Sequence, residues 1–65
     1  MKIQVNHLTQ ELPDGSSLQD LLRALDFKPP YAVARNLMFI PKTLYATTPL
    51  QEGDQIEVIS PVTGG

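Results

Sequence analysis

Hydrophobic and polar residues alternate at the start of the chain. Within residues 1–6, Ile3 and Val5 fall on one side and polar residues on the other, which is the period-two pattern of a half-buried strand. A weaker alternation in residues 8–12 predicts a second strand. Because the two segments are almost continuous, we expect a tight hairpin turn around Asn6-His7 to join them.

The pattern then changes to that of an amphipathic helix. Ser16 or Ser17 would begin it, and Ser16 with Gln19 three residues later fits a capping box. Pro29-Pro30 cannot continue a helix, so it should end by about Phe27. Four leucines recur at the i, i+3, i+4, i+7 spacing of one apolar stripe: Leu18, Leu21, Leu22 and Leu25.

The second half of the chain predicts shorter elements. Residues 31–35 and 38–40 read as two strands joined by a turn at Asn36-Leu37, where asparagine tolerates left-handed geometry. Residues 43–46 are expected to form one helical turn, and residues 55–60 a last strand. The order β-β-α-β-β-turn-β, with one helix to cover one face of one sheet, predicts a two-layer α+β domain.

The alternation in the last strand places Glu57 and Ile59 on the side away from the core. An exposed Ile59 could anchor a partner protein, or it could instead pack under a loop, beneath Leu44 or Tyr45. Nearby acidic residues, Asp54 among them, are expected to form a solvated turn.

Composition narrows the classes of function. With 65 residues the chain is one domain, and it has little room to enclose a small-molecule site of about 300 Å³ or more. A self-contained enzyme is therefore not expected. The net charge of −2 argues against nucleic-acid binding, which needs clustered lysine and arginine. No apolar run is long enough for a signal peptide or a membrane span, so we expect a cytoplasmic protein.

The candidate chemistry is sparse. The sequence contains no cysteine, which excludes a disulfide, a zinc–thiolate site and a thiol nucleophile. His7 is the only histidine and fits a polar turn residue. No spacing of ligand residues suggests a metal site.

The C-terminal Gly64-Gly65 is the one unusual feature. Glycine lacks a Cβ, so a slender arm of this kind could enter the narrow active site of another protein. Its carboxylate would become reactive if ATP adenylated it, and sulfur could then displace AMP to leave a thiocarboxylate. In a chain without cysteine, this terminus is the plausible covalent carrier of sulfur. The alternative is a frayed tail whose glycines have no role.

Four segments resemble a known family. Val33-Ala34-Arg35-Asn36 is similar to its "V-A-x-N" strand end, and Ile40-Pro41-Lys42 to its "V-P-R/K" step. Residues 50–58 are similar to its "L-x-x-G-D-x-I-E-V/I" run, and Gly64-Gly65 matches its ending. Over its whole length, the chain resembles the ThiS-type sulfur carrier proteins of thiamin biosynthesis.

The resemblance implies a ubiquitin-like β-grasp fold, with one mixed sheet of four to five strands and a single helix packed on one face. Residues 1–61 would form the domain and residues 62–65 a flexible tail. The chain would be a monomer that binds no cofactor, nucleic acid or membrane.

The resemblance also implies a carrier rather than an enzyme. An adenylyltransferase resembling ubiquitin-activating enzymes would use ATP to activate the Gly65 carboxylate, with Gly64 keeping the tail slender. A cysteine desulfurase or another donor would supply sulfur, and thiazole synthase would receive it. The side chains expected to meet these partners are those of Glu57, Ile59 and Val62.

Three alternatives stay open. Residues 60–65 also resemble the "P-P-V-x-G-G" ending of the small subunit of molybdopterin synthase, which uses the same thiocarboxylate chemistry. The other two are a ubiquitin-like protein modifier that is joined to lysines and a β-grasp interaction module whose tail is inert.

Overall fold

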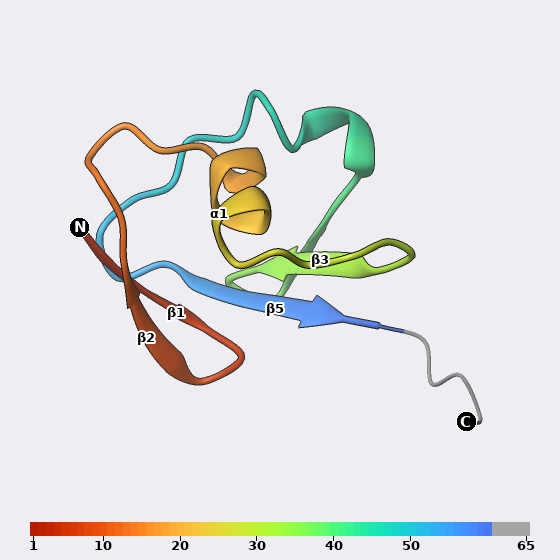
Figure 1. The fold of residues 1–65 in the computed structure, drawn as a ribbon, viewed down its shortest axis with the longest axis horizontal. Coiled ribbons are helices and arrows are strands. Elements are labelled where there is room, and N and C mark those ends of the chain that lie inside the picture. Colours follow the sequence, from red (N-terminus) through yellow and green to blue (C-terminus); the bar gives the residue numbers. More distant parts are fainter. Residues whose placement is uncertain (61–65) are drawn as a thin grey trace.

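The computed structural model describes residues 1–60. Within that range the chain forms the predicted order of elements, shown in Figure 1. The helix is shorter than expected, since it ends at Ala24 rather than near Phe27, and the helical turn begins one residue early as a 3-10 helix. The elements are β1 (Lys2–Val5), β2 (Leu8–Glu11), α1 (Leu18–Ala24), β3 (Ala32–Arg35), β4 (Met38–Ile40), η1 (Lys42–Leu44) and β5 (Gln55–Ile59).

The strands make one mixed sheet in the order β2-β1-β5-β3-β4. The last strand lies in its centre, parallel to β1 and antiparallel to β3. Helix α1 covers one face and leaves the other face open (Figure 1). The two-layer α+β architecture predicted from the sequence is therefore confirmed, with five strands in the sheet.

Both hairpins turn through two residues with positive φ. Asn6 and His7 have φ of 51° and 69°, and Asn36 and Leu37 have φ of 50° and 69°. Positive φ at both central positions is the geometry that matches the twist of paired strands, and asparagine adopts it more readily than most residues. Both predicted turns are confirmed.

The core lies between α1 and the sheet. Leu18, Leu21 and Leu22 of the predicted stripe are buried, and Leu25 is partly buried against them. Strands β1, β3 and β5 bury alternate side chains beneath the helix, and Tyr45 and Leu50 close the core at its margin. The buried strand residues are Ile3, Val5, Val33, Ile56 and Val58.

The capping box differs from the one we predicted. Ser17 caps the helix: its Oγ accepts the Asp20 N–H at 3.1 Å, and its own N–H donates to Asp20 Oδ2 at 2.9 Å. Ser16 instead donates its hydroxyl to the Pro13 carbonyl and accepts the Leu50 N–H at its own carbonyl. Ser17 also forms an isolated antiparallel bridge with Pro49 of a distant loop, and the helix begins at Leu18.

The cap also affects Asp20 itself. The hydrogen bond from the Ser17 backbone N–H, followed by that with the Ser17 side chain, lowers the pKa of the Asp20 carboxyl below its ordinary value of 3.8. The ionised carboxylate therefore stabilises the start of α1, in agreement with the preference of helix N-termini for negative charge.

Candidate functional site

The predicted site residues belong to β5 and to the residues that follow it in the sequence. Strand β5 runs through the middle of the sheet, and its last residue, Ile59, pairs with Ala32 at the start of β3. Gly64, Gly65 and Val62 lie outside the described residues. The structure therefore defines the strand that leads to the C-terminal glycines and the surface around it.

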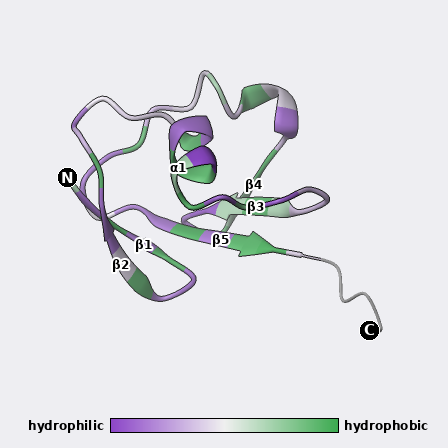
Figure 2. Cartoon of the chain, viewed as in Figure 1, coloured by the Kyte–Doolittle hydropathy of each residue, from purple (hydrophilic) through white to green (hydrophobic). Residues whose placement is uncertain are grey.

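Ile59 lies on the open face of the sheet, as predicted. Its side chain is 57% exposed, so the alternative in which it packs beneath Leu44 or Tyr45 was wrong. The end of β5 is hydrophobic in Figure 2. This is the only part of β5 where an apolar side chain is exposed among the residues described.

A second apolar side chain lies across the same face. Phe39 of β4 pairs with Ala34 of β3 and is 67% exposed. The small side chains of Ala32 and Ala34 stand between it and Ile59. We refer to these four residues, Ala32, Ala34, Phe39 and Ile59, as the open-face patch. Ala32 and Ala34 are partly exposed, and exposed apolar side chains gathered on one face are typical of protein-binding sites.

The rest of the open face is polar. Glu57 is partly buried opposite Ala34, at the boundary of the patch. Beyond it, Gln55 pairs with Gln4, and Gln4 pairs with Thr9 on β2. The apolar half thus lies beside the end of β5, and Glu57 has the position expected of a residue at the rim of a protein contact.

Asp54 was predicted wrongly as part of a solvated turn. It is 5% exposed and accepts hydrogen bonds from Arg35 Nε at 3.0 Å, Asn36 Nδ2 at 3.2 Å and the Gln51 N–H at 2.8 Å. These contacts join the β3–β4 hairpin to the start of β5. The Val-Ala-Arg-Asn and Gly-Asp segments of the sequence therefore meet in space, which their spacing did not reveal.

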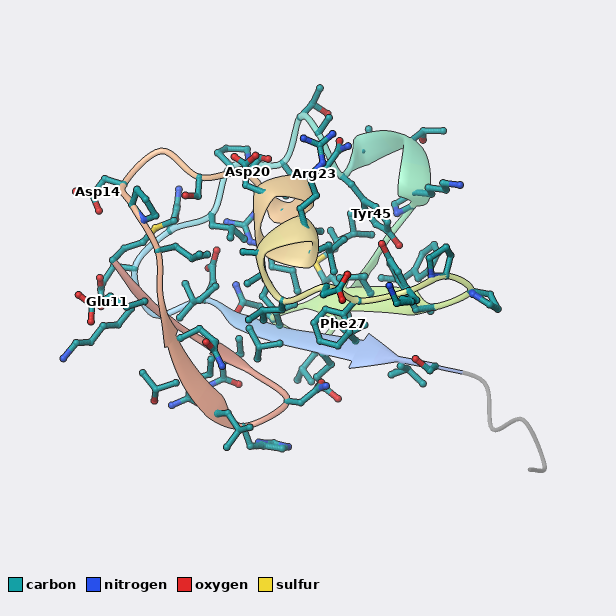
Figure 3. The ribbon with its side chains drawn as sticks, viewed as in Figure 1. Glu11, Asp14, Asp20, Arg23, Phe27 and Tyr45 are labelled. Atoms are coloured by element: carbon teal, nitrogen blue, oxygen red, sulfur yellow. The ribbon has the colours of Figure 1, made fainter. Side chains whose placement is uncertain are left out.

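An aromatic groove lies on the helix side of the sheet. It has a volume of about 360 Å³ and is lined by Arg23, Phe27, Lys42 and other side chains. The Tyr31 and Tyr45 rings stack at 6.1 Å, and burial raises the pKa of the Tyr45 hydroxyl above its ordinary value of 10.0. Figure 3 labels Arg23, Phe27 and Tyr45, which come from α1, the segment after it and the residue after η1.

Neither a metal centre nor a membrane span was identified in the described part of the chain. Residues 1–60 contain no group of three or more acidic or histidine side chains placed to hold a metal ion. His7 is an exposed turn residue, as predicted. None of the helices described here is both long and apolar enough to cross a membrane.

Comparison with known proteins identifies a family. The sequence profile of the ThiS family matches residues 3–65. The chain is 39% identical to a thiazole synthase from Magnetococcus marinus over 66 aligned residues, but it spans only about a fifth (20%) of that protein. It is also 39% identical to the uncharacterized protein ycf40 of Pyropia yezoensis, 93% of which it covers.

A solved structure has the same fold. The thiamine biosynthesis protein ThiS from Geobacter metallireducens superposes with a TM-score of 0.85 over 100% of both chains, at 22% sequence identity. That similarity confirms the predicted β-grasp fold. The profile match, which covers nearly the whole chain, gives the relationship: this protein belongs to the ThiS family.

Proposed function

We propose that this protein is a sulfur carrier of thiamin biosynthesis, whose Gly65 carboxylate is adenylated, converted to a thiocarboxylate and consumed by thiazole synthase. The observation that carries the proposal is the extent of the family match, which runs through residue 65 and so includes Gly64-Gly65. The strand that leads to these glycines is the central strand of the sheet.

The chemistry follows from the weakness of a carboxylate as an electrophile. Attack of a Gly65 carboxylate oxygen on the α-phosphorus of ATP would release pyrophosphate and form an acyl adenylate. A sulfide equivalent would then add to the acyl carbon and expel AMP, leaving the thiocarboxylate. The ATP would belong to the activating partner, and a cysteine desulfurase or a similar donor would supply the sulfur.

The relative from Magnetococcus marinus supports thiazole synthase as the acceptor. A segment similar to this chain makes up a fifth of that thiazole synthase. Two domains in one polypeptide meet at a high effective concentration, which favours pairs of domains that work together.

The open-face patch is suited to the required docking. A carrier must present its C-terminus to at least two proteins in turn, and a patch beside the end of β5 would hold the domain while the terminus enters an active site. Ile59 would be the central apolar contact, Glu57 a polar contact at its edge, and Val62 a contact along the terminal segment.

The test is the intact mass of the protein after incubation with ATP, a sulfur donor and a ThiS-type activating enzyme. We expect a gain equal to sulfur replacing oxygen, located on Gly65 by fragmentation. The variant that lacks Gly65 should show no gain while its circular dichroism and melting temperature match those of the full chain. A full gain in that variant would contradict the proposal.

The acceptor is tested in a second step. Thiocarboxylated protein mixed with thiazole synthase and its small-molecule substrates should lose its sulfur as thiazole forms. Loss of sulfur only to the large subunit of molybdopterin synthase would assign the alternative acceptor. An unchanged mass, with an enzyme shown to be active on another carrier, would favour a modifier or an inert interaction module.

A further inference from the structure

Asn6 lies where β1 stops and β5 continues. Its backbone N–H donates to the Ile56 carbonyl at 2.9 Å and continues the parallel ladder that ends with the pair Val5 and Ile56. The chain then turns away toward β2 because Asn6 and His7 have positive φ. From this point on, backbone atoms of β1 are no longer available to pair with β5.

The side chain of Asn6 takes over that pairing. Its Oδ1 accepts the Val58 N–H at 2.9 Å, and its Nδ2 donates to the Val58 carbonyl at 3.3 Å. A carboxamide has the same donor and acceptor groups as a peptide unit, so it acts here as one further residue of strand. Val58 is thus held from the β1 side, while the neighbouring pair of Ile59 with Ala32 holds β5 from the β3 side.

Asn36 pairs with the backbone of β5 in a similar way at the other end of that strand. It follows β3, has positive φ, and donates its backbone N–H to the Gln55 carbonyl at 2.8 Å. Its Oδ1 accepts the Gln55 N–H at 2.9 Å. Each hairpin therefore fixes the central strand with an asparagine side chain, one at its first residue and one close to its last.

We propose that Asn6 is a positioning residue for the reaction at Gly65, an inference that rests on the proposed function. Asn6 fixes the direction of β5 at Val58, seven residues before the carboxylate. Adenylation needs that carboxylate in line with ATP, and small misplacements of reacting atoms cost large factors in rate. Asn6 does not touch the reacting atoms. It acts through Val58, by fixing the end of β5 that precedes the terminal segment in the sequence.

The matched variants are Asn6→Gly and Asn36→Gly. Glycine accepts positive φ without strain, so each change removes one carboxamide and leaves the turn intact. Asn36→Gly should destabilise the fold at least as much as Asn6→Gly, because it also removes a contact with buried Asp54. It acts at the end of β5 far from the terminus and controls for lost stability.

The experiment measures adenylation by the activating enzyme, as pyrophosphate release, at a temperature where both variants are folded. Asn6→Gly removes both side-chain hydrogen bonds to Val58, whereas Asn36→Gly leaves them in place. We expect Asn6→Gly to lower kcat about tenfold while the Kd for the activating enzyme changes less than about twofold. Asn36→Gly should leave kcat within about twofold of the wild type.

Amide hydrogen exchange provides a readout that does not depend on activity. In Asn6→Gly the exchange rate of the Val58 N–H should rise about tenfold or more, measured against the Val33 N–H as an internal reference. In Asn36→Gly the exchange rate of the Gln55 N–H should rise instead. Equal loss of kcat in both variants, or an unchanged kcat beside faster Val58 exchange, would overturn the positioning role alone. A wild-type chain that is not adenylated would overturn the proposed function and the positioning role together, even if the exchange results hold.

Discussion

Individual polar residues fix the central strand of this protein. Asp54, Asn6 and Asn36 all bond to the backbone or the neighbours of β5. The motif residues Asn36 and Asp54 therefore have a structural explanation that involves no partner. The residues available to a partner are instead apolar side chains of the open face, among which Ile59 is adjacent to the terminal segment.

At this scale, Ile59→Asp should weaken binding to the activating enzyme. A carboxylate within the open-face patch would have to lose water in an apolar contact, and the loss of a central apolar side chain at an interface costs about 1.4 kcal/mol or more, a tenfold rise in Kd. The Kd of the complex measures this. The melting temperature should change little, since Ile59 is 57% exposed.

Leu44→Asp is the matched control. Leu44 is 47% exposed but belongs to η1, outside the open-face patch. We expect the Kd of the Leu44→Asp variant for the activating enzyme to remain within about twofold of the wild-type value. If both substitutions weakened binding equally, Ile59 would not be a specific part of the contact.

Helix α1 shows how an element can be predicted while its boundary is missed. The four-leucine stripe identified the helix and the face it buries. Two adjacent serines, each with a polar residue three positions later, made the cap ambiguous. The structure shows that Ser17 is the cap, and Ser17 also forms an antiparallel bridge with Pro49, a contact that no local pattern reveals.

The cap makes stability depend on pH. The pKa of Asp20 is lower in the folded chain than its ordinary value of 3.8. Its ionised form therefore stabilises the fold above that value, and the contribution is lost as the pH falls below it. We expect Asp20→Asn to be less stable than the wild type near neutral pH and to lose less stability between pH 5 and pH 2 (about the range in which carboxyls titrate).

Urea unfolding at a series of pH values measures this difference. Asp26→Asn serves as the control. Asp26 closes the other end of α1 through its backbone, with positive φ and an N–H bonded to the Arg23 carbonyl, while its exposed carboxylate contacts Lys28 and not the start of the helix. Its unfolding curves should keep the pH dependence of the wild type over this range. Parallel curves for Asp20→Asn and the wild type would contradict the role assigned to the cap.

The whole molecule depends on a small core. A domain of 65 residues buries a modest fraction of its surface, and such cores rarely supply more than about 3–5 kcal/mol of net stability. Among the described residues, one helix and one face of one sheet provide eight of the ten buried apolar side chains. Loss of a single buried leucine is therefore a large change for this protein.

Leu22→Ala should lower the free energy of unfolding by about 2–5 kcal/mol, the usual cost of emptying a leucine site. Leu22 is 4% exposed, so part of the population should be unfolded at room temperature. Urea or thermal unfolding measures the loss. The control is Arg23→Ala, on the exposed side of the same helix. It should change the free energy of unfolding by less than about 0.5 kcal/mol. A similarly small change for Leu22→Ala would contradict this account of the core.

Periodicity and turn chemistry in the sequence alone determined the order of the elements, both asparagine turns, the buried leucines and the side of β5 on which Ile59 lies. These features depend on contacts between near neighbours in the chain. Only the tertiary structure decided that β5 is the central strand, that Asp54 is buried, and that Asn6 and Asn36 hold β5 from opposite sides. Those features depend on pairings between residues up to 52 positions apart, which no local pattern of hydrophobic and polar residues encodes.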